Sequence, residues 1–546
     1  MHKFLLRRNP VLLILLSFLA SCAQVLTPDG GPKDAIPPHV VEFAPDSAAT
    51  NFTGNKIVLK FDEYIQLKDL NNQLIISPPL NNDPDVIIRR RDIVITLNDT
   101  LLPNTTYTIS FGNSIRDITE ENVLDNFRYV FSTGPVIDSL RISGKVVNAS
   151  TLGGEKGILV MLYSNTGDSV PLKQRPYYFA KTKDDGSFTM TNLKAGKYKL
   201  IALDDKNSNY FFDNSAERIA FSSELLDLTK NNDSINLKIF KEEPLKQARI
   251  KAQQFAAGRF AFSYALPMKD PQVSFIPALP AGMEVFKEFS VNGDSIDLWF
   301  NTVLLDSITF VVHDETTALN DSVSMMMVKP GDKSKRIRTG ANDPRKLVVN
   351  PNVASGQLFD LGKPLVITTN NPLRAFNPKD FILLKGKDTL KAEPSLSTNK
   401  RVISFNYTFA EDSSYSLHVK PGAVTDWFGQ KNDTIKVNFK IRESRYYGTL
   451  SVKLTGLPAG NYLLRVVNDK DMVLREMKIT NATTAKFELL SPGSYRLKLI
   501  ADENKNGKWD SGNYLQHKQP ERVIYYINPV KMRSGWDMDV EWIFKN

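Results

Sequence analysis

The chain has 546 residues, of which 42% are hydrophobic and 10% aromatic, and its formal net charge is +9. At about 150 residues per domain this length predicts three to five domains, and the composition is sufficient to give each a packed core. The single cysteine excludes a disulfide within the chain. The positive charge is dispersed, and its densest run, Arg89–Arg91, lacks the interleaved aromatic residues of a nucleic-acid platform, so we expect no nucleic-acid partner.

The N-terminus has the plan of a signal peptide. Basic residues, among them Arg7 and Arg8, precede a short apolar stretch at 11–19, and small residues then lead to Cys22. This stretch is shorter than the about 20 residues that a membrane-spanning helix needs. The run Leu19–Cys22 resembles the lipobox of bacterial lipoproteins, which implies cleavage before Cys22 and lipidation of its thiol, and hence a membrane anchor. The alternative is an ordinary secretory signal that happens to contain a cysteine.

Short runs with a period of two dominate the chain after a Pro- and Gly-rich stretch at 22–37, which we interpret as a tether. In one such run Val437, Phe439 and Ile441 alternate with polar residues. Strict alternation, punctuated by Asn, Asp, Gly and Pro at intervals of about 8–12 residues, is typical of half-buried antiparallel strands. We therefore predict an all-β protein built from tandem β-sandwich modules.

One stretch of sequence occurs twice, at a constant offset of 297 residues. Gly196–Leu200 and the polar residues after it return as Gly493–Leu497 and its own polar residues, and a short insertion then follows in the second copy before Glu521. A weaker repeat links 107–111 with 415–419, each just before a copy of the first repeat. The predicted organisation is a signal peptide at 1–21, the tether at 22–37, and modules at 38–135, 138–240, 245–340, 345–442 and 446–546.

Two kinds of module resemble known families. The first, with Leu102–Tyr107 and a closing Phe131–Thr133, is similar to bacterial Ig-like domains. The second, with Asp185–Phe188 and then Leu193–Tyr198, is similar to the transthyretin-like or carboxypeptidase-regulatory-like sandwich, whereas the middle module at 245–340 has no specific match. Behind a lipobox and the tether segment Gly30–Asp34, this combination resembles the Ig-like-domain lipoproteins of Bacteroidota. The resemblance implies a fold and a location at the outer membrane, but it says little about chemical function.

The polar loop of the repeated module predicts a structural calcium site. In the second copy, four oxygen-bearing side chains occupy positions one, three, five and nine of an EF-hand-type loop: Asp502, Asn504, Asn506 and Asp510. Gly507 stands at position six and Lys508 at position seven. The loop departs from the motif at position twelve, which holds Asn513 where a bidentate Glu is expected. The first copy, with Tyr210 at position six, is the poorer candidate; its residues are Asp205, Asn207, Asn209 and Asp213. The alternative is a hairpin turn without a metal, and no cofactor is otherwise required.

A second recurrent pattern is Asp, then Ser or Thr, then an aliphatic residue. It resembles the O-glycosylation sequon of exported Bacteroidota proteins, and the hydroxyls it offers are Ser47, Thr100, Ser139, Ser169, Ser234, Ser295, Ser307, Ser322, Thr389 and Thr434. The equally simple alternative is a turn residue that leads into a strand.

The sequence contains no recognisable catalytic motif: no paired His, no nucleophile elbow and no phosphate-binding Gly loop. We therefore expect a non-enzymatic, lipid-anchored envelope protein that binds a protein partner or serves a structural role, for example as an accessory subunit of an outer-membrane assembly or export complex with a β-barrel partner. One alternative is a carbohydrate- or matrix-binding adhesin, with Trp427, Trp509 and Trp536 as candidate sugar-stacking residues. Another is an accessory domain array for a separate enzyme. Surface-exported lipoproteins of Bacteroidota tend to carry acidic residues just after the cysteine, whereas the first acid after Cys22 is Asp29. The sequence therefore does not decide which face of the outer membrane the protein occupies.

Overall fold

A computed structural model describes residues 34–214, 216–328 and 346–544. Their regular secondary structure is almost entirely β-strand, so the all-β prediction is confirmed. The alternation predicted for 435–441 is present as β35, in which Val437, Phe439 and Ile441 are buried and the residues between them exposed. No helix in the described ranges is long and apolar enough to cross a membrane.

The strands form five sandwich modules, which we name A1, B1, M, A2 and B2 in chain order. Module A1 contains β1 (Val40–Ala44), β2 (Lys56–Phe61), β3 (Ile65–Leu67), α2 (Leu70–Gln73), β4 (Ile75–Ser77), β5 (Asp85–Arg89), β6 (Asp92–Thr96), β7 (Thr106–Gly112), β8 (Ile115–Asp117) and β9 (Phe127–Ser132). Its two larger sheets, β1-β2-β6-β5 and β4-β7-β9, enclose an aromatic-rich core, and β3 and β8 form a small third sheet.

Module B1 contains β10 (Leu140–Asn148), β11 (Leu159–Tyr163), α3 (Val170–Lys173), β12 (Tyr178–Lys181), β13 (Ser187–Leu193), β14 (Gly196–Leu203), β15 (Ile219–Phe221), β16 (Leu226–Leu228) and β17 (Asn232–Ile239). Its sheets are β13-β10-β17, in which β10 and β17 run parallel, and β12-β11-β14-β15, to which β16 is attached through β14.

Module M contains β18 (Arg249–Ala256), β19 (Arg259–Tyr264), β20 (Gln272–Ile276), β21 (Val285–Phe289), β22 (Ser295–Phe300), β23 (Ser307–Asp314), the short η2 (Glu315–Thr317) and β24 (Leu319–Met326). It is a two-sheet sandwich of β18-β19-β22-β21 and β20-β23-β24.

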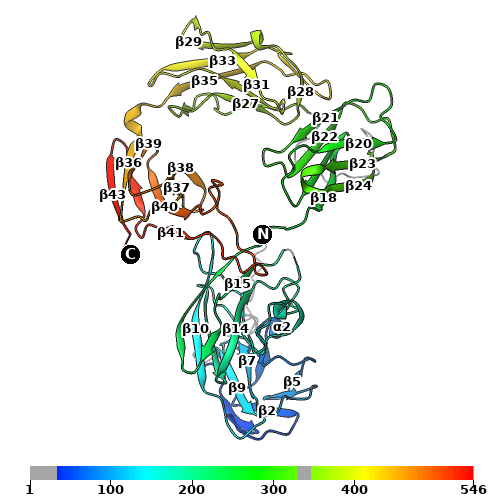
Figure 1. The fold of residues 1–546 in the computed structure, drawn as a ribbon, viewed down its shortest axis with the longest axis vertical. Helices are drawn as coiled ribbons and strands as arrows, with labels where there is room; N and C mark the ends of the chain where they lie inside the picture. The colour runs from blue at the N-terminus through cyan, green and yellow to red at the C-terminus, as the bar shows by residue number, and fades with distance from the viewer. Residues whose placement is uncertain (1–33, 215, 329–345, 545–546) are drawn as a thin grey trace, which may run out of the picture.

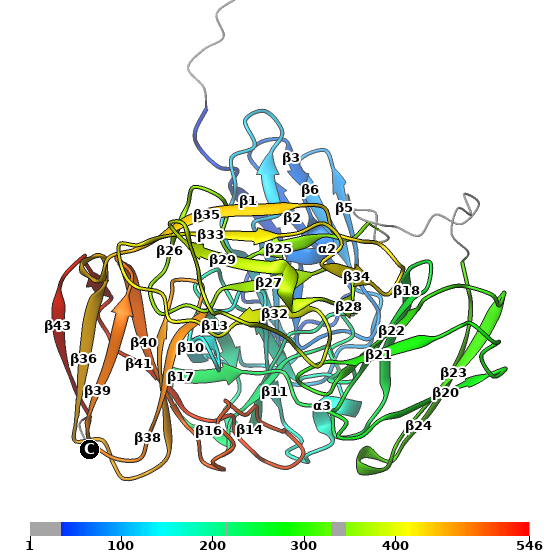
Figure 2. The same ribbon diagram turned by 90° about the horizontal axis from the view of Figure 1, so that it is seen from above.

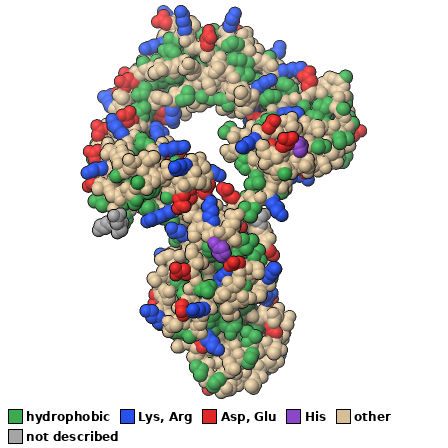
Figure 3. Space-filling model, in the orientation of Figure 1, with side chains coloured by type: hydrophobic (Ala, Val, Ile, Leu, Met, Phe, Trp, Pro, Cys, Tyr) green, Lys and Arg blue, Asp and Glu red, His purple; other side chains and the backbone are tan. Residues whose placement is uncertain are grey.

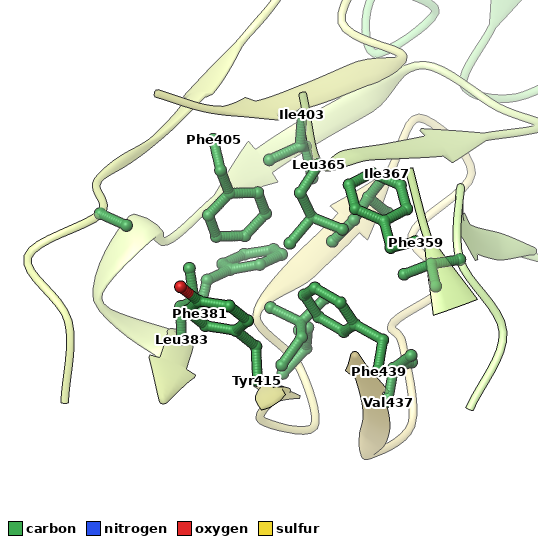
Figure 4. Close-up of a cluster of buried hydrophobic side chains, with 14 of the residues drawn as sticks. Phe359, Leu365, Ile367, Phe381, Leu383, Ile403, Phe405, Tyr415, Val437 and Phe439 are labelled. Carbon is green, nitrogen blue, oxygen red and sulfur yellow. The ribbon is translucent and has the colours of Figure 1, made fainter. Parts of the chain in front are cut away.

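Module A2 contains β25 (Val349–Pro351), β26 (Leu358–Phe359), β27 (Val366–Thr369), β28 (Leu373–Phe376), η3 (Pro378–Asp380), β29 (Phe381–Lys385), β30 (Asp388–Thr389), β31 (Pro394–Leu396), β32 (Val402–Phe405), β33 (Ser414–Val419), β34 (Val424–Asp426) and β35 (Ile435–Ile441). The sheets β25-β27-β32-β31 and β26-β35-β33-β29-β30 face each other across the apolar core in Figure 4.

Module B2 follows η4 (Ser444–Tyr446) and contains β36 (Gly448–Thr455), β37 (Tyr462–Val467), β38 (Val473–Ile479), β39 (Thr484–Leu490), β40 (Gly493–Ala501), β41 (Val523–Tyr525), β42 (Val530–Met532) and β43 (Asp537–Ile543). Its sheets, β39-β36-β43 and β38-β37-β40-β41, reproduce the topology of B1, including the parallel pair, here β36 and β43.

Four of the modules are arranged as a ring, and A1 projects from it. A1 extends B1 at one end, and B1, M, A2 and B2 follow one another around an opening (Figure 1). From above, A2 lies between B2 on one side and M on the other (Figure 2). Figure 3 shows that side chains do not fill the opening.

Aromatic and ionic contacts join M to A2. The rings of Phe286 and Trp427 lie 5.5 Å apart, and Arg401 pairs with Glu288 at 3.3 Å. At the next junction the Tyr447 hydroxyl donates to Asp360 at 3.0 Å. The ring is therefore held at its junctions by side-chain contacts as well as by the chain itself.

Leu383 and Leu384 of β29 offer a matched test of the core in A2. Leu383 is 1% exposed inside the sandwich, whereas its neighbour Leu384 points to the other face and is half-buried. We expect Leu383→Ala to lower the free energy of unfolding of A2 by about 2–5 kcal/mol, because it removes buried methyl groups and leaves a cavity. Leu384→Ala should cost clearly less. Calorimetry of both variants, with hydrogen exchange of β29 to assign the transition, measures the difference; equal losses would contradict this assignment of the core.

Candidate functional site

The two repeated modules, B1 and B2, contact each other through a loop that is longer in B2. The segment from Asp510 to Glu521 has seven residues more than the segment from Asp213 to Glu217 in B1. This extra length carries Tyr514, which is 2% exposed although it lies in a loop. We call residues 511–519 the B2 arm.

The side chain of Tyr514 is inserted against the outer face of the β12-β11-β14-β15 sheet of B1. Its ring packs edge-on to Phe221 with centroids 5.4 Å apart, and Lys199 Nζ lies 5.5 Å from its centroid. The hydroxyl donates to the backbone oxygen of Asp168 at 2.9 Å and accepts from Lys199 Nζ at 3.2 Å. Both ends of this amphipathic side chain are therefore satisfied on B1.

Polar contacts fix the rest of the B2 arm. The Tyr514 backbone N–H donates to the carboxylate of Glu242, and Gln519 Nε2 donates to the backbone oxygen of Phe221 at 3.0 Å. Burial raises the pKa of the Glu242 carboxyl. Burial is the largest single influence on Lys199 and acts to lower its pKa, but the hydrogen bonds and charge interactions with Asp168, at 2.6 Å, and with Tyr514 together leave the pKa raised.

The contact is reciprocal, because a turn of B1 lies on B2. Lys498 Nζ donates to Ser150 Oγ at 3.2 Å, and Leu152 packs against an apolar cluster of B2 that includes Ile500. Lys498 is 3% exposed and pairs with Asp471 at 2.6 Å. Burial lowers the pKa of this lysine, and the ion pair with Asp471 opposes the effect.

The pairing registers show that the equivalent sheet faces of the two copies present chemically different residues. The row of residues across the B1 sheet is Phe179, Met161, Ile201 and Phe221, and the equivalent row in B2 is Glu476, Arg465, Lys498 and Tyr525. The B1 face is apolar and is covered by Tyr514, by its own loop and by Ile75 of A1. The B2 face is charged, with Arg465 and Glu476 paired at 2.6 Å. Only the apolar face provides a pocket for the B2 arm.

The predicted calcium loops have nearly the same structure in both copies. Asp502 accepts the backbone N–H groups of Asn506 and Gly507, each at 3.0 Å, and the side-chain amides of Asn504 and Asn506 donate to Asp510. In B1 the same bonds link Asp205 with the N–H groups of Asn209 and Tyr210, and Asp213 with the amides of Asn207 and Asn209. Tyr210 adopts the positive φ, 70°, that Gly507 adopts without steric cost at 78°.

A buried glutamate closes each of these loops. Glu521 accepts the backbone N–H groups of Glu503 and Asp510, and Glu217 does the same for Lys206 and Asp213. Burial raises the pKa of both glutamates. Within the described ranges, no group of three or more His, Cys, Asp or Glu is placed to hold a metal ion. Because the amide nitrogens face Asp510 and Asp213, the structure shows these loops as hydrogen-bonded turns, and calcium binding stays a prediction.

The other predicted residues lie apart from this contact. Cys22 and the signal peptide are outside the described residues. Of the ten O-glycosylation candidates nine are exposed, and Ser295 is half-buried with its hydroxyl donating to Asp294. Exposure fits both a glycan acceptor and a turn residue, so this prediction also stays open.

The three tryptophans proposed for sugar stacking have different surroundings. Trp427 packs at the M–A2 junction, and Trp509 packs at the B1–B2 contact, where its Nε1 donates to the backbone oxygen of Glu521. Trp536 alone of the three is largely exposed, at 48%. Sequence reasoning found none of Tyr514, Lys498 or Asp471; the length difference between the repeats was the available signal for Tyr514.

Comparison with known proteins identifies the first two modules. Residues 34–133 match the family model of the bacterial Ig-like domain, and residues 139–236 match that of the second β-sandwich domain of BOS complex subunit NOMO1-like proteins. No curated protein matches the sequence significantly.

Several solved structures are similar at low identity. The S-layer protein SbsC aligns with 86% of this chain at 10% identity and a TM-score of 0.14; the aligned part is 66% of that chain, so the present chain spans just under two thirds of it. The Bacillus anthracis TIE protein aligns over 99% of this chain and 79% of its own, at 11% identity and a TM-score of 0.14. BcpA, the major pilin subunit of Bacillus cereus, aligns over 74% of this chain and 99% of its own, at 7% identity and a TM-score of 0.13.

Removal of the Tyr514 side chain should release B2 from B1. Tyr514→Ala leaves the Phe221 face uncovered and Lys199 without one partner, and truncation of such a central, buried aromatic anchor costs about 2 kcal/mol or more. We expect small-angle scattering to show a larger radius of gyration and hydrogen exchange to accelerate in β15. Leu515→Ala, at a 54% exposed position of the same arm, is the matched control and should change neither. An unchanged scattering curve for Tyr514→Ala would show that the ring does not depend on this contact.

The buried Lys498–Asp471 pair predicts a non-additive pair of substitutions. Asp471→Ala leaves an uncompensated charge on a lysine that is 3% exposed, which costs about 3–5 kcal/mol of B2 stability. Adding Lys498→Ile, which introduces the residue of the first copy, Ile201, should recover most of that loss. Thermal unfolding of the two single variants and the double variant measures the coupling. Additive losses would mean that the ion pair is energetically independent.

Proposed function

We propose that this protein is a non-enzymatic, lipid-anchored scaffold of the cell envelope that binds partner proteins. The observation that carries the proposal is the ring, in which the B2 arm fixes four sandwich modules in one arrangement instead of leaving them as a flexible string. Inter-domain motion is the usual expectation for modules joined by short linkers. A fixed ring presents loops and sheet edges at constant spacing, which suits binding more than reaction chemistry.

The strand β38 is the surface that we propose for a partner. Within the described residues it pairs with β37 alone, so its other edge is open. Its first two residues and the residue just before it are apolar and exposed, Val473 at 48%, Leu474 at 38% and Met472 at 56%. In Figure 1 β38 lies on the side of B2 that faces the opening of the ring.

The equivalent strand of the first copy indicates what covers such an edge. In B1 that strand is β12, and it contacts β4 of the Ig-like module A1, where the Phe179 N–H donates to Ser77 Oγ at 3.3 Å. Phe179, on the face toward A1, is buried in a cluster that Ile75 of β4 packs against. Because no strand in the described part of the chain pairs with the outer edge of β38, we propose that a β-strand of another protein takes this place, by strand addition to the open edge.

A subunit of an outer-membrane assembly or export complex is the partner that we propose. The strands of a closed barrel have no free edge, so the added strand would come from a loop or a terminal segment of a β-barrel subunit in the same membrane. A lipid on Cys22 would keep this protein within reach of it. This part of the proposal rests on the lipobox-like Leu19–Cys22 and on the open edge of β38.

Site-specific photocrosslinking in native membranes tests the partner. A crosslinker at Leu474 should yield an adduct with a β-barrel protein, whereas one at Ile527, which is apolar and 89% exposed elsewhere on B2, should not. Equal adducts from both positions, or recovery of the protein alone, would contradict the proposal.

The lipid anchor has its own test. Cys22→Ser should move the protein from the membrane fraction to the soluble fraction and remove the acyl mass, because the thiol that carries the lipid is gone. The circular dichroism spectrum should stay the same, since Cys22 precedes all five modules. Membrane association that persists in Cys22→Ser, or a native N-terminus without lipid, would exclude this anchor.

A further inference from the structure

A cleft of about 220 Å³ lies at the junction of A1 and B1. Its floor is apolar and aromatic, with Pro78 and Tyr107 from A1 and Pro176 from B1, all of them buried. Arg175 of B1 stands at the rim and donates to the backbone oxygen of Leu80 at 2.7 Å, which fixes the two modules relative to each other. Ligand sites occur preferentially at such junctions.

The rim offers hydrogen-bonding groups that the protein itself leaves unused. Arg175 has five N–H donors; one of them bonds to Leu80 and the guanidinium lies over the Tyr210 ring, 5.6 Å from its centroid, which leaves further N–H groups for a ligand. Among the described residues, the side-chain amide of Asn81 has no hydrogen-bond partner, and Gln174 uses only its oxygen, as an acceptor from Asn165. Asp99 accepts two backbone N–H groups and retains further lone pairs.

The charge of the cleft selects a neutral ligand. Arg175 and Asp99 are the only charged residues in its lining, and their charges cancel. A phosphate or a carboxylate would therefore be repelled by Asp99 as well as attracted by Arg175, and an ammonium would be repelled by Arg175 as well as attracted by Asp99.

We propose that this cleft binds the ring of a neutral sugar. A pyranose has an apolar C–H face, which fits the floor of Pro and Tyr side chains. Its hydroxyls both donate and accept, which fits the acceptor Asp99, the donor Arg175 and the amide of Asn81, whose backbone N–H is bonded to Asp99. The volume is below the about 300–1,000 Å³ of pockets for drug-sized ligands, so the cleft takes one ring and leaves the rest of a glycan outside.

The second copy shows that the sandwich fold does not require these residues. The β12 and β38 registers align Lys181 with Lys478, at the repeat offset of 297 residues. At this offset Gln174, Arg175, Pro176 and Tyr177 of the cleft correspond to Asp471, Met472, Val473 and Leu474. The fold is retained without the guanidinium and without the aromatic ring, so these two groups serve the junction of A1 with B1.

The sugar has two sources that an experiment must separate. Thr100, a predicted O-glycosylation residue, lies in the lining of the cleft, so a glycan attached there would reach the site without a separate ligand. Protein produced in a host without this modification, and verified by intact mass, presents an empty Thr100. Native protein with extra mass on Thr100 and no response to added sugar would identify the attached glycan as the occupant.

Saturation-transfer NMR and calorimetry on the unmodified protein, with glucose, galactose, mannose, fucose and N-acetylglucosamine as probes, test the site. We expect saturable, millimolar binding of at least one sugar and none of inorganic phosphate. Arg175→Met and Tyr177→Leu, which introduce the residues of the second copy, should each weaken binding at least tenfold. Lys173→Gln, next to the cleft but outside its lining, is the matched control and should bind as the wild type does.

Asn81→Ala keeps the proposal testable if Arg175→Met disturbs the junction. Asn81 is exposed and its side chain holds no partner, so this variant should fold normally and still lose at least threefold in affinity. The proposal is overturned if no sugar binds saturably and Thr100 carries no glycan in the native protein, if phosphate binds in preference to the sugars, or if binding is unchanged in all three cleft variants.

Discussion

The insertion of Tyr514 into the face of B1 is the contact on which the arrangement of the modules depends. Tyr514 and Asp168 are 346 residues apart in the chain, yet the hydroxyl and the backbone oxygen meet at 2.9 Å. Each linker alone would permit motion between neighbouring modules. Because the chain already brings B2 near B1, the contact is intramolecular, and a modest interface is sufficient at such an effective concentration. One buried aromatic ring with a satisfied hydroxyl therefore converts a string of sandwiches into a ring.

The repeat explains why this contact forms in one direction only. Both copies have the same sheet, but the B1 face presents Phe221 and Ile201 where the B2 face presents Tyr525 and Lys498. A second arm could not find an apolar pocket on B2, and B1 has no arm, since its loop is seven residues shorter. The buried Lys498–Asp471 pair adds little net stability, because the cost of desolvation offsets the attraction. Its effect is on specificity: the charged row accepts the polar side chain of Ser150, while Leu152 of the same turn packs on the apolar residues next to that row.

The sequence was sufficient to predict the fold class, because alternation in segments such as 435–441 reports directly which residues face a core. It also showed the repeat and its insertion. The contact of Tyr514 could not be predicted from the sequence, because an isolated tyrosine in a polar loop belongs to no periodic pattern and its pocket is assembled from distant strands. The calcium prediction remains untested. The spacing of Asp502, Asn504, Asn506 and Asp510 fits oxygen ligands, but an asparagine offers a nitrogen as readily as an oxygen, and only the structure shows the nitrogens turned toward Asp510.

The open edge of β38 is best understood from how sheet edges are normally protected. Natural edge strands avoid unwanted pairing through charges, short length or a covering element. β12 has the covering element, in the form of A1. β38 has charges from its third residue onward, at Arg475, Glu476 and Lys478, whereas its first two residues, Val473 and Leu474, and Met472 just before them are apolar and exposed. If this edge never paired, a charged residue at its start would protect it against unwanted pairing. The contrast between the apolar start of β38 and its charged remainder therefore favours a partner that pairs with only three or four residues, at the start of the strand.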